Sequence, residues 1–251
     1  MKSVCKSMSS IVGQAHDEHV RFVLSLSKEE WDYDGTRPSL SNPHTILTKM
    51  NDLCVEVLWD EGNRRSHKKL MPVLEHYGQA DVLVIDDDVI PEDGWLQAFI
   101  DDHRRNPRDI IYGTSSSRVE MVNGQILEGI AQRDLFLFPG MKTRNIKPAN
   151  GANGTLYPSG TFTDPRFFDR SLYMRLSATS DETWNWAWAV MTGRSHRCLS
   201  SHNFPTVICE EQAYALSHTN ILRYTDIHNA IAREFPLYKE KLYELINNKE
   251  L

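Results

Sequence analysis

The segment 81–88, with the sequence DVLVIDDD, constrains the fold more than any other part of the chain. Its apolar run is typical of a short buried strand in a parallel sheet, and three carboxylates follow directly. Adjacent carboxylates repel one another, so they must face solvent or be neutralised by a cation. The carboxyl ends of strands are also where open α/β sheets bind ligands. The segment therefore predicts a cation-assisted ligand site; the alternative is an acidic loop after a core strand.

The composition is that of an ordinary globular chain with an acidic balance. Its 251 residues can bury one large α/β core. The net charge is −6, from 28 Lys and Arg against 34 Asp and Glu. No basic block dominates, so we do not expect nucleic acid as a partner. An acidic protein that binds an anionic ligand needs a divalent cation or a few placed basic side chains.

The cysteines and the apolar segments indicate in which cellular compartment the protein is expected. The spacing of the four cysteines matches no zinc pattern and no secreted disulfide framework. We therefore expect reduced cysteines in a cytoplasmic protein. No segment approaches the length of about 18 apolar residues that a transmembrane helix needs, and the start of the chain has no signal-peptide core.

Strand and helix patterns alternate through the first 113 residues. The expected strands cover residues 21–26, 54–59, 81–85 and 109–113, and the expected helices cover residues 1–18, 44–51, 60–77 and 91–106. This alternation is typical of a mostly parallel central sheet with helices on both faces. The fold class expected from the sequence is therefore α/β.

The pattern changes after residue 113. The later segments are expected to form a hairpin at 119–125, a short strand at 135–138, a loop rich in Gly, Asn and Pro at 147–165, a helix from Asp181 that Ser180 caps, and helices from Asp226 to the end with a break at Pro236. Glycines in the loop let the backbone approach a ligand closely.

The acidic triplet has the spacing of a cation clamp. Asp86 and Asp88 lie two residues apart, so in an extended strand their side chains point to the same face. Two carboxylates on one face can hold a hard divalent cation through oxygen, and leave its other positions open to phosphate oxygens.

Four segments resemble the motifs of GT-A fold glycosyltransferases, closest to small bacterial enzymes of polysaccharide assembly. They are SHKKL at 66–70, VIDDDV at 84–89 followed by WL at 95–96, the Gly-rich loop 151–160 with its Tyr-Pro pair, and DETW at 181–184, which has Glu where the family has a second Asp. The resemblance covers residues 5–240.

The resemblance implies a fold, a reaction and a metal. The fold would be the Rossmann-like GT-A domain, and the reaction would move a sugar from a nucleotide-diphosphate donor, expected to be a UDP-sugar, to a hydroxyl of a glycan or lipid-linked acceptor. Asp86 and Asp88 would hold Mn²⁺ or Mg²⁺, which supports the leaving diphosphate. His218 is the expected third metal ligand. No membrane anchor is visible, but a lipid-linked acceptor is compatible with peripheral membrane contact.

The resemblance also divides the chain and assigns donor contacts. One domain over residues 1–251 is expected, with a nucleotide- and metal-binding half at 1–113, an acceptor-side half at 114–225 and C-terminal helices at 226–251. Lys68 and Lys69 are expected to reach the nucleotide or its phosphates; the alternative is a solvated basic helix face. Asp87 is expected to face the ribose or the sugar, or to cap a helix.

An acidic pair is the expected source of the general base. Asp181 or Glu182 would deprotonate the acceptor hydroxyl, as the matching acid does in inverting members of the family. Asp181 is preferred because it matches the leading acid of the motif. The alternative is that both acids only stabilise a helix N-terminus, by about 0.3–1 kcal/mol each.

The acceptor or sugar pocket is expected to include Gly151, Gly154, Tyr157 and Trp184. Aromatic faces stack on sugar rings, and glycine allows close approach. The alternatives are a turn-rich connection for the glycines and a hydrophobic core for the tryptophan.

One departure from the family bears on activity. GT-A domains usually begin with a strand and a loop that holds the nucleotide base, but residues 1–10 contain no strand-like apolar run. We therefore expect the first strand to be missing or short. A catalytically silent sugar-binding or scaffold protein of polysaccharide assembly stays open as an alternative. A sugar nucleotidyltransferase is a further alternative. The absence of a Gly-rich, basic phosphate-binding loop at the start of the chain argues against it.

Overall fold

The structure is a computed structural model that describes most of the chain. It describes residues 2–15, 19–31, 43–78, 80–113, 116–129, 142–143, 146–148, 154–199, 206–207 and 223–247. The elements up to residue 113 are α1 (Lys2–Val12), β1 (Val23–Ser27), α2 (Lys28–Trp31), α3 (Pro43–Asp52), β2 (Glu56–Asp60), η2 (Arg65–Lys69), α4 (Met71–Tyr77), β3 (Val82–Val84), β4 (Val89–Ile90), α5 (Trp95–Arg105) and β5 (Ile110–Tyr112).

The described residues of the second half add one hairpin, several short strands, a short 3₁₀-helix and α-helices to these. Its elements are β6 (Ser116–Val122), β7 (Gln125–Glu128), β8 (Lys142–Thr143), β9 (Ile146–Pro148), β10 (Thr155–Tyr157), η3 (Pro165–Phe168), α6 (Arg170–Leu176), α7 (Asp181–Met191), β11 (His196–Cys198), β12 (Thr206–Val207), α9 (Tyr224–Glu234) and α10 (Pro236–Asn247). The strand predicted at 135–138 lies outside the described residues.

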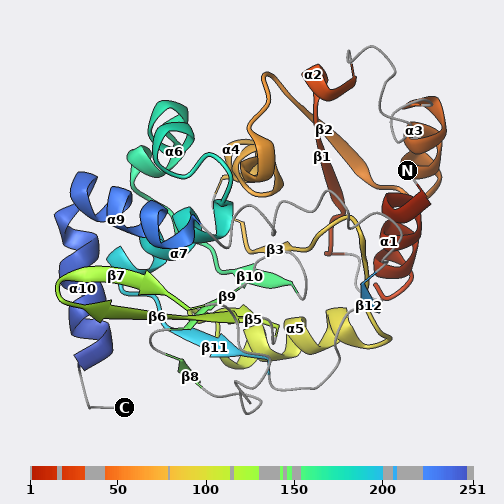
Figure 1. Ribbon diagram of the computed structural model, residues 1–251. Coiled ribbons are helices and arrows are strands. Elements are labelled where there is room, and N and C mark those ends of the chain that lie inside the picture. The colour runs from red at the N-terminus through yellow and green to blue at the C-terminus, as the bar shows by residue number, and fades with distance from the viewer. Residues whose placement is uncertain are drawn as a thin grey trace.

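The centre of the molecule is a sheet of five described strands in the order β3-β10-β5-β11-β8 (Figure 1). The predicted α/β class is confirmed, and parallel pairing occurs between β1 and β2 and between β5 and β11. Strand β10 enters between β3 and β5 from the opposite end and is antiparallel to both, and β8 is antiparallel to β11. The sequence predicted a loop for residues 155–157, so the strand β10 corrects that prediction.

Both faces of this sheet are covered, which explains the unbroken apolar run of β3. Val82 and Val84 pack into a cluster that includes the tryptophans of α7. Leu83 packs with the opposite cluster, which includes Trp95 and Phe99 of α5. Alternate residues of a strand point to opposite faces, so a strand buried on both sides needs apolar residues at every position. Figure 1 shows α5 on one side of the sheet and α7 on the other.

A second, smaller unit packs at the N-terminal end of the chain. Strands β1 and β2 form a parallel pair, and α1 and α3 lie beside them (Figure 1). Val4, Met8, Leu24 and Met50 belong to the buried cluster that joins these elements. The first described element is the helix α1, and the first described strand is β1. This order agrees with the absence of a strand-like apolar run in residues 1–10.

Three helix boundaries differ from the prediction. The helix expected over 1–18 ends at Val12, before Gly13. The helix expected over 60–77 begins only at Arg65, whose φ is 52°. It is divided into η2 and α4 at Leu70, which has φ of −115°, and Pro72 in the first turn of α4 has no N–H to continue the helical hydrogen bonds. The helix expected from residue 91 begins only at Trp95, because Gly94 before it adopts the left-handed φ of 84°. Residues 91–93 therefore belong to the connection that follows the acidic triplet.

Three other boundaries were predicted correctly. The hairpin turn at Asn123-Gly124 has positive φ at both positions, 50° and 78°, as a type I′ turn requires. Ser180 caps α7 by accepting a hydrogen bond from the backbone of Thr183. Pro236 opens α10 after α9 has ended.

Candidate functional site

The acidic triplet lies in the connection between β3 and β4, and not in a strand. Strand β3 ends at Val84, and Asp87 and Asp88 form a turn. Asp86 is partly buried, whereas Asp87 and Asp88 are exposed. The inference that Asp86 and Asp88 share a face of an extended strand is therefore wrong, because the strand ends before the triplet. Their approach to a common ligand has to come from the turn.

Helix α1 fixes the segment that follows the triplet. The hydroxyl of Ser7 donates to the backbone oxygen of Val89, and the hydroxyl of Ser10 donates to that of Pro91 at 3.3 Å. Strand β4 also pairs with β12. The triplet is thus held between β3 on one side and an anchored β4 on the other.

Lys69 is the basic partner of the triplet. Its ammonium forms an ion pair with Oδ1 of Asp86, and both side chains are partly buried. Burial opposes the positive charge of Lys69, but the carboxylates of Asp86, Asp181 and Glu182 outweigh that effect and raise its pKa well above the ordinary value. Lys69 is therefore a firmly charged ammonium between two acidic groups. Lys68, its neighbour in η2, is also partly buried.

The first turn of α7 places its acidic pair beside η2. The backbone N–H of Asp181 donates to the hydroxyl of Ser66, at 3.4 Å. Asp181 is only 2% exposed, and its Oδ2 has no hydrogen-bond partner among the described residues. A buried carboxylate oxygen without a partner is costly, so this atom is available to a donor group.

Glu182 has the more accessible carboxylate of the pair. It is partly exposed, and the hydroxyl of Tyr224 donates to its Oε2 at 3.4 Å. Burial, together with repulsion from Asp181 and Asp86, raises its pKa to about 6, against the opposing effect of Lys147 and Lys69. A carboxylate with a pKa near 6 suits proton transfer at neutral pH.

A buried ionic network, which the sequence did not suggest, lies behind Glu182. Nζ of Lys147 lies 3.1 Å from Oε1 of Glu128 and 4.2 Å from the ring centroid of Tyr224. Nε2 of His228 lies 2.8 Å from Oε2 of Glu128, and the hydroxyl of Tyr238 lies 2.7 Å from Nδ1 of His228. We call these five residues the Glu128 network.

The network keeps Glu128 ionised. Burial alone would raise the pKa of Glu128, but Lys147, His228 and Ser117 reverse that effect and lower it to about 2. Burial lowers the pKa of His228, so its neutral ring can donate to Glu128 through Nε2 and accept from Tyr238. The members come from β7, β9, α9 and α10, and no sequence motif links such distant segments.

The two aromatic residues predicted for the pocket lie in the core. Trp184 is fully buried, and its indole N–H donates to the backbone oxygen of Phe167 at 3.1 Å. Tyr157 is 2% exposed and packs against Phe162. Neither ring presents a face to a ligand, so the predicted stacking role of Trp184 and the pocket role of Tyr157 are corrected to core packing.

Glycine is required at position 154 for a packing reason. Its φ is 83°, and a Cβ there would lie 2.6 Å from Cζ2 of Trp95. The close approach that the sequence suggested for a ligand is made to α5. Two further predicted residues lie outside the described residues: Gly151, predicted for the pocket, and His218, predicted as the third metal ligand.

The donor set of the triplet suits a hard divalent cation. Partial loss of hydration, with repulsion from Asp86 and Asp87, raises the pKa of Asp88, and a bound cation would relieve that repulsion. Among the described residues no group of three or more His, Cys, Asp or Glu side chains is placed to enclose a metal ion. Mg²⁺ is often held by only one or two carboxylates, with water and substrate phosphate as its other ligands. Asp86 and Asp88 fit that type of site.

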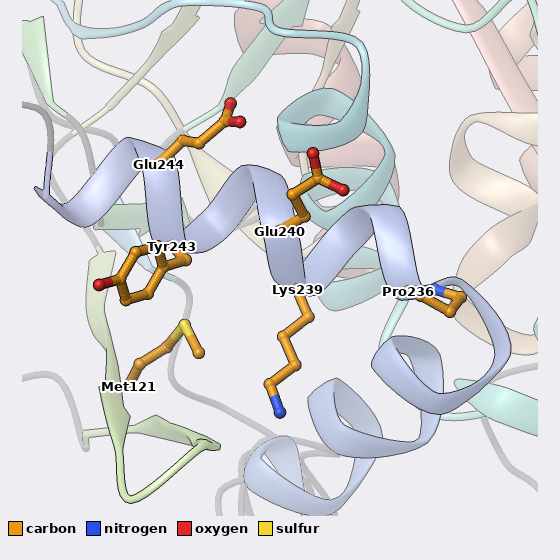
Figure 2. A pocket seen from close by; sticks show the side chains of 6 residues that line it. All are labelled: Met121, Pro236, Lys239, Glu240, Tyr243 and Glu244. Atoms are coloured by element: carbon orange, nitrogen blue, oxygen red, sulfur yellow. The ribbon is translucent and has the colours of Figure 1, made fainter.

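A separate hollow lies on another face of the molecule. Its volume is about 440 Å³, and Met121 of β6 and Lys239, Glu240 and Tyr243 of α10 are among its lining residues. Figure 2 shows these side chains along α10 and beside the β6 strand. The hollow is open and shares no residue with the acidic triplet or with the first turn of α7, so it is not the candidate site.

No helix among the described residues has the length and apolarity to cross a membrane.

Comparison with known proteins gives only distant likenesses. No family model matches the chain, and no curated protein matches it. A UTP-bound UGPase from Acinetobacter baumannii is similar with a TM-score of 0.45 and 10% identity, over 99% of this chain and 88% of that one. An apo UDP-glucose pyrophosphorylase has a TM-score of 0.45 and 8% identity, over 92% of this chain and 86% of that one. Likenesses at this level assign neither a family nor an activity.

Proposed function

We propose that this protein is a metal-dependent glycosyltransferase. It would move a sugar from a nucleotide-diphosphate donor, a UDP-sugar, to a hydroxyl of a glycan or lipid-linked acceptor in the cytoplasm. The observation that carries the proposal is the position of Lys69, which pairs with Asp86 of the triplet and interacts with Asp181 and Glu182 of α7. This position supports one charged site in which the acidic turn after β3 would bind the cation and the start of α7 would supply the general base.

The donor side of the proposal uses the triplet and η2. Asp86 and Asp88 would hold Mn²⁺ or Mg²⁺, which when bound neutralises charge on the leaving diphosphate. Lys68 and Lys69 would contact the phosphates, and Asp87 would face the ribose or the sugar. The half of the chain at 1–113 is then the nucleotide- and metal-binding half.

The acceptor side uses the start of α7. Glu182 would take the proton of the acceptor hydroxyl, since it is the accessible carboxylate and its pKa is raised to about 6. The acceptor oxygen then bonds to the anomeric carbon, the bond from that carbon to the β-phosphate oxygen breaks, and the nucleoside diphosphate leaves. Attack from the face opposite the leaving group gives inversion. Asp181 would support the site from its buried position.

The assay of function needs two arms. With Mn²⁺ and a panel of UDP-sugars, the protein should release UDP, and more of it when glycan or lipid-linked acceptors are added. With UTP and sugar 1-phosphates, it should release no pyrophosphate. Pyrophosphate release without UDP release would replace the proposal by a sugar nucleotidyltransferase. Binding of the donor without release of UDP or pyrophosphate would instead support a catalytically silent sugar-binding protein of polysaccharide assembly.

A further inference from the structure

Lys69 occupies a carboxylate oxygen that the proposed cation needs. Its ammonium pairs with Oδ1 of Asp86. A divalent cation that takes this oxygen repels the ammonium and competes for the same lone pairs. Asp86 has a second oxygen, but a cation bound there still lies close to the ammonium and is repelled by it, so cation binding favours the departure of Lys69 from Asp86. This step rests on the proposed function, in which a cation binds the triplet.

A second carboxylate is available to Lys69 on the other side of the site. Asp181 is 2% exposed, and its Oδ2 has no hydrogen-bond partner among the described residues. The charge of Asp181 already acts on Lys69, after that of Asp86. A buried acceptor of this kind gains most from a donor that is itself charged.

The geometry of η2 directs Lys69 toward Asp181. Ser66, three residues before Lys69, accepts the hydrogen bond from the backbone N–H of Asp181. Residues three apart in a 3₁₀-helix lie on the same side. Lys69 therefore leaves η2 on the side that already contacts α7. Its side chain is long and flexible, as a change of partner requires.

We propose that Lys69 is a positioning residue with two carboxylate partners. It neutralises Asp86 while no divalent cation is bound, and its ammonium passes to Oδ2 of Asp181 when a cation takes Asp86. Binding on the donor side then fixes a charge–charge contact at the first turn of α7, next to Glu182. The donor site and the acceptor site are coupled through this one side chain.

A double-mutant cycle on the affinity for Mn²⁺ alone tests the proposal. Isothermal titration without nucleotide would compare the wild type, Lys69→Met, Asp181→Asn and the double variant. Lys69→Met should bind Mn²⁺ roughly three- to tenfold more tightly, because its competitor is gone. Asp181→Asn should bind roughly threefold more weakly, because the displaced ammonium loses its second partner, yet should change nothing in the Lys69→Met background.

Controls separate displacement from general electrostatics. Arg65→Gln removes an exposed positive charge from the same turn and should leave the Mn²⁺ affinity nearly unchanged. In thermal unfolding, a fixed Mn²⁺ concentration should stabilise Lys69→Met more than the wild type, since tighter binding to the folded state gives a larger shift. This second measurement holds even if Lys69→Met is unstable without the cation.

Three results would overturn the proposal. Binding of Mn²⁺ to Lys69→Met that is no tighter than binding to the wild type would show that Lys69 is not a competitor. If Asp181→Asn weakened Mn²⁺ binding equally in the wild type and in Lys69→Met, Asp181 would act only as a distant attractive charge and not as a partner of Lys69. Both of these leave the proposed function intact, provided that the wild type binds Mn²⁺. Absence of Mn²⁺ binding by all four proteins would contradict the metal role as well.

Discussion

Lys147 and Glu128 form an ion pair with 3.1 Å between Nζ and Oε1, and their side chains are only 2% and 1% exposed. The pair joins β9 to β7, and His228 and Tyr238 extend it into the C-terminal helices. A buried pair of this kind is no proof of stability, because desolvation offsets much of the attraction. Breaking it from one side is costly, since one buried charge is then left uncompensated.

The first prediction concerns this pair. Lys147→Met should lower the free energy of unfolding by about 3–5 kcal/mol, because it leaves the charge of Glu128 buried without its cation. Urea unfolding at pH 7 measures the change. The matched control is Lys241→Met, which breaks the exposed pair with Glu244 and should cost less than about 1 kcal/mol. Equal losses for the two variants would contradict the prediction.

The second prediction is the acid dependence of stability. The pKa of Glu128 is lowered from 4.5 to about 2 in the folded protein, so the unfolded chain binds its proton first as the pH falls. The stabilisation from this group is complete above pH 4.5 and is lost between pH 4.5 and 2, by an amount on the order of 3 kcal/mol. Glu128→Gln should show a correspondingly shallower loss over that range. Parallel curves for the two proteins would argue against an ionised Glu128.

The third prediction concerns Glu182 as the general base. If Glu182 with its pKa of about 6 accepts the proton, kcat/KM should fall as the pH drops through 6, because the carboxylate becomes protonated. Glu182→Gln should lower kcat at least roughly 100-fold and keep donor binding. Initial rates from pH 5 to 8 and titration of the donor measure both. Full turnover of Glu182→Gln would show that the acid is only part of the helix start.

The fourth prediction separates packing from backbone strain. Gly154 and Gly193 both have positive φ, 83° and 69°, but only at Gly154 would a Cβ meet Trp95, at 2.6 Å. Gly193→Ala should cost about 1 kcal/mol from strain alone. Gly154→Ala should cost about 1–3 kcal/mol more, from overpacking against α5. Equal losses in thermal or urea unfolding would mean that Trp95 moves aside freely.

The sequence predicted the elements whose causes are local. The apolar runs of β1, β2, β3 and β5, the Asn-Gly turn of the hairpin and the Ser180 cap each depend on neighbouring residues. It failed where the cause lies elsewhere. Residues 155–157 contain only three apolar or β-branched positions after a Gly-rich stretch, and they become a central strand because β3 and β5 provide pairing edges on both sides.

The sequence predicted the triplet, Lys69 and the acidic pair of α7, but it missed the Glu128 network. The triplet, Lys69 and the acidic pair of α7 stand in short, recognisable segments, and the structure brings them together. Lys147, Glu128 and His228 come from three separate elements, so only the tertiary fold shows their contact. The buried state of Trp184 likewise depends on packing against η3 and α9, which no spacing within α7 reveals.

The acidic triplet carries the central claim, and titration of UDP in the presence and absence of Mn²⁺ tests it most directly. With Mn²⁺ the wild type should bind UDP, and chelator should abolish the binding. Asp88→Ala should abolish it as well, whereas Glu92→Ala, which removes an exposed carboxylate just beyond β4, should not. UDP binding that is equal with Mn²⁺ and with chelator, and unaffected by Asp88→Ala, would contradict the account.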